Sequence, residues 1–291
     1  MSATHKTPLG KTICLTFDVE DYFQVENLRS IYPLDTWDRQ IFRVERPTIQ
    51  ILDLLDQHHI KGTFFVLGWV AERLPYLVKE IHAQGHEIAS HGYSHKLNTP
   101  EFFSDSELSD DIKRSKDLLE NIIGEKVLGY RAPSFSIHEK VLSILKDLDF
   151  HYDSSFNPIS WNKRCGQINT NSNTNSFLHK TGVQEFSIPQ QLLFGRKIPL
   201  GGGGYFRLYP LTFFLKLVQK YLQDNDLMIF YLHPWELDSK QPRFWTELRI
   251  DHGFRHYYGL KSSASKLEKF IQWGKKKQVN FSRIDQYLKT A

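Results

Sequence analysis

Two histidines four positions apart, His91 and His95, are the residues whose types and spacing most directly suggest chemistry. They follow the run from 86 to 90, in which apolar and polar residues mix as expected near the end of a strand. Imidazoles at this spacing can face one ion, and imidazole is a common metal ligand. Because the chain has 13 histidines, the pair alone is a modest signal, and a metal site also requires carboxylates from elsewhere.

An acidic cluster at residues 18–21 (Asp-Val-Glu-Asp) supplies such carboxylates. It directly follows residues 12–17, whose composition predicts a buried strand. Carboxylates and imidazoles at two neighbouring strand ends would form a hydrolytic metal site. Arg131, Asp153 and His233 also lie at the C-terminal ends of predicted strands, which is where α/β barrels place their active sites.

The periodicity of the chain predicts alternating strands and helices with short connections. Repeated β-α units indicate an α/β fold with a parallel sheet and outer helices, closed or nearly closed into a barrel. We find no linker and no internal repeat, so we expect a single domain over residues 1–291, in which residues 237–291 are an extension packed on the barrel. The predicted strands cover residues 12–17, 62–67, 86–89, 127–130, 150–153, 185–188, 191–198, 227–232 and 279–282, and the predicted helices cover 46–58, 71–84, 104–123, 137–148, 211–222 and 262–275.

Two stretches break this alternation. Residues 154–182 contain an Asn- and Thr-rich run at 169–175, which we interpret as a loop. Residues 201–204 are four consecutive glycines, which predict either a flexible turn or a place where the backbone closely approaches a sugar.

Composition and charge argue against several classes of function. The net charge of +4 is small, and Lys and Arg are scattered apart from a run at 275–277 that suits the solvated end of a helix, so we expect no nucleic-acid binding. No apolar run approaches the roughly 18–20 residues of a membrane span, and residues 1–10 are polar without a secretory pattern. With only Cys14 and Cys165, a disulfide framework is not expected, and we expect a cytoplasmic protein.

Taken in order, five short motifs resemble those of the polysaccharide deacetylase superfamily, also called carbohydrate esterase family four. The resemblance implies a distorted (β/α)7 barrel and extends over residues 12–236. The predicted strand at 62–66 (Gly-Thr-Phe-Phe-Val) is also similar to a structural strand of that family. The motifs are Thr-Phe-Asp-Val-Glu-Asp at 16–21, His-Gly-Tyr-Ser-His at 91–95, Arg-Ala-Pro at 131–133, Tyr-Asp-Ser-Ser at 152–155 and Tyr-Leu-His at 231–233.

Four longer stretches resemble one branch of the family more closely, the exopolysaccharide deacetylases associated with exosortase systems in bacteria. This resemblance implies a role in bacterial exopolysaccharide or cell-wall metabolism. The stretches are FDVEDYF at 17–23, GGGYFR at 202–207, YLHPWE at 231–236 and FRHY at 254–257.

The family resemblance implies one divalent metal ion, bound by His91, His95 and a carboxylate of the first motif. No Asp follows Asp18 directly, and related deacetylases with an Asp-x-acid pattern use the residue at i+2, which here is Glu20 rather than Asp21. Strand alternation agrees, because residues i and i+2 share a face. Ligand softness favours zinc, with cobalt, nickel and manganese as alternatives.

The other motif residues would then move protons. Asp18 would take a proton from the attacking water, and Arg131 would hold and tune that carboxylate. His233 would donate a proton to the leaving amine, and Asp153 would orient and charge its imidazole.

Three residues are expected to contact the substrate. The backbone N–H of Ser134 would complete an oxyanion site, Trp235 is the best candidate for a sugar platform, and Tyr205 belongs to the GGGYFR stretch. Two further positions depart from the family pattern. Ser134 stands where an aromatic residue usually follows Arg-x-Pro, and Phe156 stands where a tryptophan is common. Both positions shape the walls around the acyl group and the sugar, so the sequence does not identify the polymer.

Three functions are compatible with these residues. The leading hypothesis is a metal-dependent hydrolase that removes N-acetyl groups from an amino-sugar polysaccharide or its precursor. The second is an amidase acting on a small cyclic amide, as in allantoin-type enzymes of this superfamily, with residues 154–182 as a lid. The third is a non-catalytic glycan-binding module, which the presence of Asp18, the metal ligands and His233 disfavours. The oligomeric state is not determined by the sequence.

Overall fold

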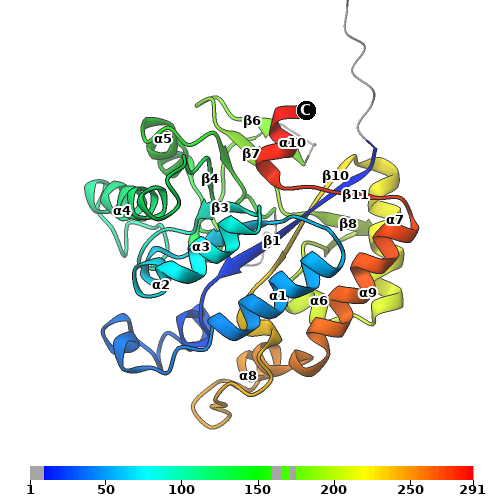
Figure 1. Cartoon of the computed structure of the whole chain (residues 1–291), viewed down its shortest axis with the longest axis horizontal. Helices are drawn as coiled ribbons and strands as arrows, with labels where there is room; N and C mark the ends of the chain where they lie inside the picture. Colours follow the sequence, from blue (N-terminus) through cyan, green and yellow to red (C-terminus); the bar gives the residue numbers. More distant parts are fainter. Residues whose placement is uncertain (1–9, 159–164, 171–174, 291) are drawn as a thin grey trace, which may run out of the picture.

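The computed structural model describes residues 10–158, 165–170 and 175–290 (Figure 1). Seven parallel strands form a curled sheet in the order β10-β1-β2-β3-β4-β5-β7, and β6 pairs with β7 antiparallel at one edge. Among the described residues no ladder joins β7 to β10, so the sheet is an open barrel, and the predicted α/β fold of the distorted (β/α)7 type is confirmed. The strands are β1 (Thr12–Val19), β2 (Thr63–Val66), β3 (Glu87–Ser90), β4 (Gly129–Tyr130), β5 (Tyr152–Asp153), β6 (Ser176–Leu178), β7 (Gln184–Phe186), β8 (Gln190–Leu193), β9 (Arg196–Pro199), β10 (Leu227–Leu232) and β11 (Asn280–Phe281).

The central strands are buried along their whole length. Every residue of β1, β2 and β3 is buried. Strands of a parallel sheet that are covered on both faces read as continuous apolar runs, which is why residues 12–17 predicted a buried strand correctly. The polar residues at the C-terminal ends of these strands are consequently also shielded from solvent. Asp18 is 1% exposed and His91 is 2% exposed.

Helices cover the sheet on its outer side (Figure 1). The longest, α4, begins with a capping box in which Ser104 and Glu107 bond each other's backbone, and it ends at Gly124 in the left-handed conformation. The helices are α1 (Glu45–Gln57), α2 (Gly68–Arg73), α3 (Pro75–Ala83), α4 (Asp105–Ile123), α5 (Glu139–Asp147), α6 (Gly203–Leu208), α7 (Leu211–Asp224), α8 (Ile250–Tyr257), α9 (Ser263–Lys276) and α10 (Ile284–Thr290), with 3-10 segments η1 (Tyr22–Gln24), η2 (Glu26–Leu28), η3 (Leu34–Arg39), η4 (Pro133–Phe135), η5 (Pro234–Leu237) and η6 (Leu260–Ser262).

The helix predicted over 71–84 is in fact two helices, α2 and α3. They separate at Leu74, which adopts φ −127° and ψ 53°. The reason is Pro75, because a residue that precedes proline is disfavoured in the helical region. The periodicity also did not predict α6, α8 or α10, which are six to eight residues long.

The strand predicted over 191–198 is a hairpin of β8 and β9. It turns at Phe194 and Gly195, whose φ values of 49° and 74° are those required by a tight hairpin turn. The glycine run has a different role from a plain flexible turn. Gly202 has φ 132° and bridges Tyr231 of β10, and a Cβ atom at that position would lie 2.0 Å from the Tyr231 carbonyl oxygen. The glycines therefore allow a close backbone approach to β10.

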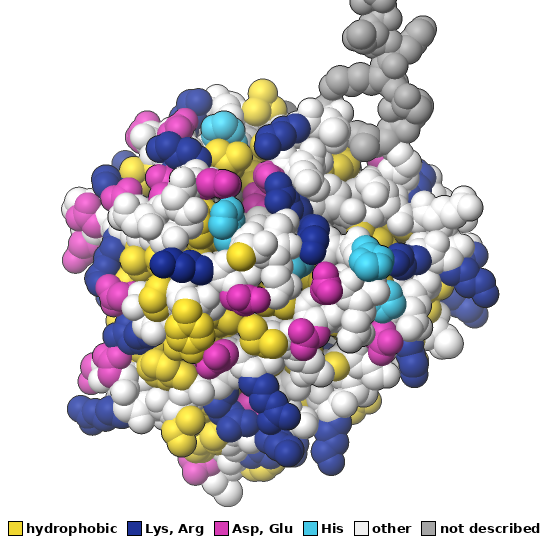
Figure 2. Space-filling model, in the orientation of Figure 1, with side chains coloured by type: hydrophobic (Ala, Val, Ile, Leu, Met, Phe, Trp, Pro, Cys, Tyr) yellow, Lys and Arg dark blue, Asp and Glu magenta, His cyan; other side chains and the backbone are white. Residues whose placement is uncertain are grey.

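The surface carries charges of both signs. Figure 2 shows Lys and Arg interspersed with Asp and Glu over the face that it presents. Ile41 and Phe42, in the segment between β1 and α1, are 76% and 37% exposed. No described helix combines the length and the apolar character required to cross a membrane. Cys14 and Cys165 are both buried, and neither forms a disulfide within the described residues. The expectations for residues 1–9, and for the parts of the 154–182 loop at 159–164 and 171–174, lie outside the described residues.

Candidate active site

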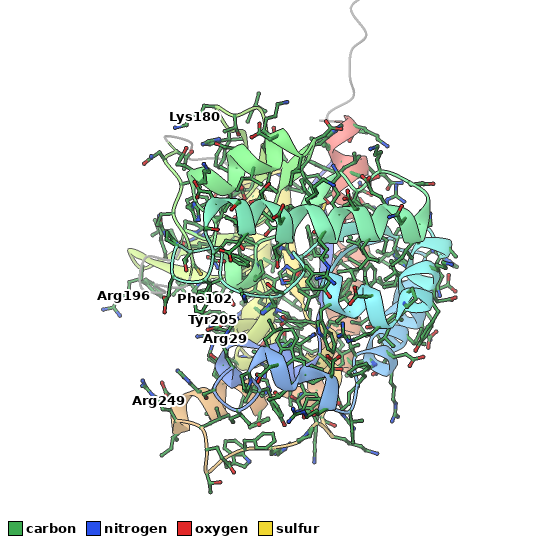
Figure 3. The ribbon with its side chains drawn as sticks, turned by 90° about the vertical axis from the view of Figure 1, so that its left-hand side faces the viewer. Arg29, Phe102, Lys180, Arg196, Tyr205 and Arg249 are labelled. Atoms are coloured by element: carbon green, nitrogen blue, oxygen red, sulfur yellow. The ribbon has the colours of Figure 1, made fainter. Side chains whose placement is uncertain are left out.

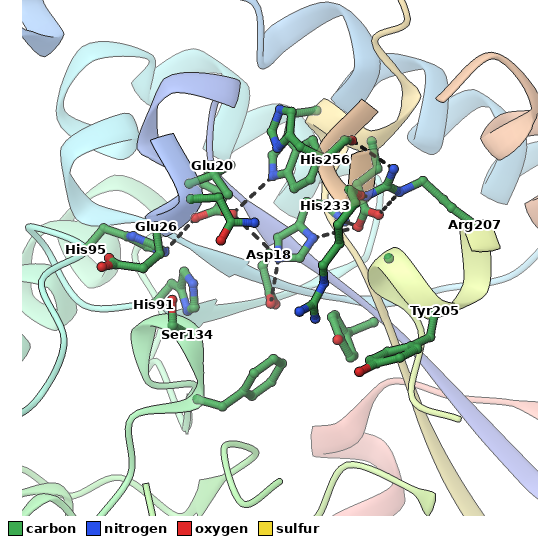
Figure 4. Close-up of a pocket in the computed structure, with 18 of the residues that line it drawn as sticks. Asp18, Glu20, Glu26, His91, His95, Ser134, Tyr205, Arg207, His233 and His256 are labelled. Atoms are coloured by element: carbon green, nitrogen blue, oxygen red, sulfur yellow. Dashed lines mark hydrogen bonds and ion pairs between the residues drawn. The ribbon is translucent and has the colours of Figure 1, made fainter. Parts of the chain in front are cut away.

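The C-terminal ends of several neighbouring strands meet around one cavity of about 340 Å³ (Figure 4). Every residue that the sequence predicted to bind metal or substrate contributes to its lining, together with Asp18 and His233. Arg131 and Asp153 are not part of the lining and lie behind it, fully buried. The charged residues and histidines of the wall that sequence reasoning did not assign are Glu26, Arg207, Glu236, His252, Arg255 and His256.

Glu20, His91 and His95 form the group best suited to hold a metal ion. Their ligand atoms lie within 4.8 Å of one another, and each residue is at most 3% exposed. The distance from His95 Nε2 to Glu20 Oε2 is 2.6 Å. By contrast, the carboxylate of Asp21 accepts hydrogen bonds from the backbone N–H groups of Tyr22, at 2.8 Å, and of Arg43, at 2.6 Å. Asp21 thus caps the start of η1, while Glu20 points to the histidines.

The chemistry of these three residues fits a divalent ion of the zinc type. Two imidazoles and one carboxylate are a common catalytic zinc ligand set. His91 Nδ1 lies 2.8 Å from the carbonyl oxygen of Arg131, so donation of its N–H to that oxygen leaves Nε2 free to bind a metal. Among the described residues, His95 Nδ1 is buried without a hydrogen-bond partner, and Glu20 Oε2 is buried beside His95 Nε2. Burial lowers the pKa of His91 to about 4, so this imidazole is neutral at neutral pH, as a ligand must be.

Charge also favours an ionised carboxylate at Glu20. Burial alone would raise the pKa of this carboxyl group, but His95, His233 and His91 outweigh burial and hold it well below its ordinary value. Trp235 Nε1 donates a further hydrogen bond to Glu20 Oε1 over 3.1 Å.

Asp18 is held by a fully buried guanidinium. Arg131 Nη1 lies 2.6 Å from Asp18 Oδ1 and 2.8 Å from the hydroxyl oxygen of Thr16. The other two nitrogens of Arg131 donate hydrogen bonds to Ser154. Nε bonds the Ser154 carbonyl oxygen and Nη2 bonds its hydroxyl oxygen, each over 2.9 Å. The ring of Phe65 lies 4.0 Å from the guanidinium carbon. This environment fixes one oxygen of Asp18, and the other oxygen, Oδ2, lies 3.7 Å from His233 Nε2.

His233 has a different partner from the one that we predicted. Its Nδ1 atom lies 2.7 Å from Glu236 Oε1, and the other oxygen of Glu236 lies 2.5 Å from Arg207 Nε. The His233 Nε2 atom faces the pocket, 3.5 Å from Glu20 Oε1. Burial alone would lower the pKa of His233, but Glu236, Glu20 and Asp18 outweigh burial and raise it to about 9. A signal for this arrangement exists in the sequence, because Glu236 follows His233 by three residues.

Asp153 does not orient His233, so that prediction was wrong. Its carboxylate accepts hydrogen bonds from the Ser155 N–H over 2.9 Å and from the Ser155 hydroxyl over 2.7 Å. It also faces Glu185 across the β5–β7 pair, and burial raises the pKa of both carboxyl groups. The reason is local: Asp153 is engaged with Ser155 and lies opposite Glu185, whereas Glu236 is in the turn that directly follows His233.

The three predicted substrate contacts lie in the cavity wall but differ in character. Ser134 has φ 51° and ψ 24°, and the oxyanion role of its N–H stays a prediction. Trp235 is only 6% exposed and stacks between His233, at 5.3 Å, and His256, at 4.5 Å between ring centroids. Trp235 is therefore held between two imidazole rings and does not present an exposed ring face on which a sugar could stack. Tyr205 is half-buried and lies across the pocket from His91 and His95 (Figure 4).

Comparisons with known proteins agree with this fold and these motifs. A family model described as Polysaccharide deacetylase matches residues 5–152, which is half of the chain. A second model, described as Domain of unknown function (DUF3473), matches residues 154–289. The chain belongs to the polysaccharide deacetylase family.

Relatives and solved structures match parts of the chain or its fold. A peptidoglycan-N-acetylglucosamine deacetylase of Bacillus cereus is 36% identical over 103 residues, covering 35% of this chain and 47% of that protein. A peptidoglycan deacetylase of Helicobacter pylori is 29% identical over 121 residues, covering 42% and 41%. Each match therefore spans less than half of the relative's length.

Two solved structures illustrate the shared fold. A peptidoglycan deacetylase from Bacillus subtilis has a TM-score of 0.53 at 15% identity, covering 98% of this chain and 93% of its own. A carbohydrate esterase family four pseudoenzyme from Bacillus anthracis has a TM-score of 0.55 at 15% identity, covering 96% and 66%. At these identities the likeness is one of fold.

Proposed function

We propose that this protein is a metal-dependent hydrolase that removes N-acetyl groups from an amino-sugar polysaccharide or its precursor. The observation that carries the proposal is the convergence on one pocket of Glu20, His91 and His95 with two further acid–base groups, Asp18 and His233. The family, and relatives that are named peptidoglycan-N-acetylglucosamine deacetylases, support an N-acetylated glycan as the substrate.

Glu20, His91 and His95 would hold one divalent ion. Zinc suits this ligand set best, with cobalt, nickel and manganese as alternatives. When bound, such an ion polarises an acyl carbonyl and acidifies a water molecule.

The chain's own residues would move the two protons of the reaction. Asp18, held in place by Arg131, would accept a proton from the attacking water as the new C–O bond forms. His233 would donate the proton on Nε2 to the amine nitrogen as the C–N bond breaks, so that acetate and a free amino sugar are released. Glu236, which contacts Nδ1 of the same imidazole, would keep that ring oriented.

We also propose that the enzyme acts in bacterial exopolysaccharide or cell-wall metabolism and is of the exosortase-associated type. The stretches at 202–207, 231–236 and 254–257 support this assignment because they meet at one place: Arg207 binds Glu236 and the carbonyl oxygen of His256. The single domain that we propose for the chain is supported by the sheet, since strands from both family matches pair with each other.

The direct test combines metal content with acetate release. Wild-type protein should contain about one metal ion per chain by mass spectrometry and should release acetate from a chitin oligomer. His91→Ala should lose both metal and activity while it keeps the circular dichroism spectrum of the fold. Asp21→Asn is the matched control, since it changes a neighbouring carboxylate that bonds backbone N–H groups, and it should keep its metal. A His91→Ala protein that still binds one ion would refute the assigned site.

A further inference from the structure

The carboxylates in the pocket wall are all paired. Asp18 is bound by Arg131 at 2.6 Å, Glu20 by His95 at 2.6 Å, and Glu26 by Arg29 at 2.7 Å. Glu236 is bound by both Arg207 and His233. Each carboxylate of the pocket wall, among the described residues, therefore already has an arginine or histidine partner.

The two arginines of the pocket wall, Arg207 and Arg255, differ in whether their guanidinium groups have a carboxylate partner. Arg207 is fully engaged, because it bonds Glu236 through Nε and backbone carbonyl oxygens of 255, 256 and 258 through its other nitrogens. Arg255 is exposed, and within the described part of the chain its side chain pairs with no carboxylate. Its guanidinium carbon lies 5.3 Å from the centre of the Tyr205 ring.

The position of Arg255 is determined by its surroundings. Arg207 bonds the carbonyl oxygen of Arg255 over 3.0 Å, which ties the end of α8 to α6. Gly204 lies under the side chain, and a Cβ atom at that position would lie 3.7 Å from Arg255 Nε. Arg255 lines the pocket, and a guanidinium that lies over an aromatic ring can still bond an anion through its in-plane N–H donors.

We propose that Arg255 and Tyr205 form an anion subsite, and that the glycan substrate carries a negatively charged group, a carboxylate or a phosphate, close to the N-acetyl sugar. The proposal rests on the deacetylase function proposed above and specifies its substrate class. Tyr205 and Arg207 lie on the side of the pocket opposite His91 and His95 (Figure 4), so the subsite would bind a part of the substrate away from the reacting acetyl group. The planar fork of arginine matches the two oxygens of either anion.

Binding measurements test this subsite independently of catalysis. The probes are neutral chitotetraose, a tetrasaccharide in which N-acetylglucosamine alternates with glucuronic acid, and N-acetylglucosamine 1-phosphate. Titration calorimetry at low salt should show at least about tenfold tighter binding of one of the acidic probes than of chitotetraose, as expected for a charge-assisted pair. The acidic probe that binds more tightly identifies the anion as a carboxylate or a phosphate.

Variants then distinguish a specific contribution of Arg255 from a general effect of positive charge on the binding of acidic probes. Arg255→Gln should remove the preference for the acidic probe and leave chitotetraose binding unchanged, and Arg255→Lys should keep part of the preference. Arg249→Gln is the matched control, because Arg249 lies next to the same helix, at the outer edge of the molecule (Figure 3), and pairs with Asp251. It should leave the preference intact.

Two outcomes separate the subsite from the function. Equal binding of the neutral and acidic probes by the wild type, or an unchanged preference in Arg255→Gln, would overturn the subsite whatever the activity. A wild type that prefers the acidic probe through Arg255 but releases no acetate from any N-acetylated probe would overturn the deacetylase function and leave the subsite standing.

Discussion

Two regions beside the pocket each bury a carboxyl group completely, and the pKa values of the two groups are shifted in opposite directions. In the first region, Glu236 lies between Arg207 and His233, and although burial opposes ionisation these two cations lower its pKa to about 2. In the second region, Asp153 faces Glu185, and burial raises the pKa of both carboxyl groups. Both Glu236 and Asp153 are 0% exposed, so burial alone does not decide the outcome.

The difference shows that the partner determines what a buried carboxyl group can do. Between two cations, Glu236 is a permanent anion that can orient an imidazole. Beside a second acid, Asp153 has a raised pKa and serves structure: it bonds the hydroxyl of Ser155, whose oxygen accepts the N–H of Ala132 over 2.7 Å. The first region therefore acts on the proton donor, and the second supports the loop that follows Arg131.

The largest expected effect comes from removing the charge in the first region. Glu236→Gln keeps the shape of the side chain but leaves the buried guanidinium of Arg207 without a counter-ion. We expect the free energy of unfolding to fall by about 3–5 kcal/mol. Acetate release from an N-acetyl sugar should fall by about a hundredfold or more, because the proton donor loses its orienting partner. Chemical denaturation and an acetate assay measure the two effects.

Two controls belong with this variant. Removing both charges, in Arg207→Gln with Glu236→Gln, should restore part of the lost stability, since no unpaired buried charge remains. Asp153→Asn should reduce acetate release much less than Glu236→Gln does. Equal loss in the two single variants would contradict the assignment of Glu236 as the partner of His233.

A third buried carboxylate, Asp18, sharpens the comparison because it is also paired with a guanidinium but faces the reacting groups. Asp18→Asn can still accept a hydrogen bond from Arg131 but cannot accept a proton. We expect acetate release to fall by at least about a hundredfold while the metal content stays unchanged. Near wild-type activity in this variant would show that another group takes the proton from water.

The raised pKa values of Asp153 and Glu185 in the second region predict a dependence of stability on pH. Because the pKa values of Asp153 and Glu185 are raised in the folded protein, the folded pair holds more protons than the unfolded chain above the ordinary carboxyl pKa of about 4. Stability must then decrease as the pH rises from there towards the raised values. Glu185→Gln should remove a slope of up to about 1.4 kcal/mol per pH unit. Denaturation of both proteins between pH 5 and 8 tests this, and parallel curves would count against a raised pKa for this pair of carboxyl groups.

The smallest expected effect lies at the link between the second region and the pocket. Ser155→Ala leaves the N–H of Ala132 without its acceptor and should lower the free energy of unfolding by about 1–2 kcal/mol. Acetate release should change by less than about tenfold, since Ser155 contacts neither Asp18 nor His233. A loss as large as that of Asp18→Asn would show that this loop positions the reacting groups directly.

The sequence by itself determined the sheet and the location of most candidate residues. Buried parallel strands read as apolar runs, and the polar residues that end β1, β3 and β10 must then meet at one edge of the sheet. The resemblance to related deacetylases favoured Glu20 over Asp21, and strand alternation agreed, because residues i and i+2 of a strand share a face. These predictions depended on local pattern and on the regular geometry of strands.

Only the tertiary structure decided the partners of those residues. The pairing of His233 with Glu236 instead of Asp153 depends on a 3-10 turn after β10, and the charge of Glu236 depends on Arg207, 29 positions earlier in the chain. The burial of Trp235 and the placement of Arg255 depend on α6 and α8, whose short segments carry no clear periodicity. Contacts of this kind join segments through long-range packing, and long-range packing is not encoded in the spacing of any one motif.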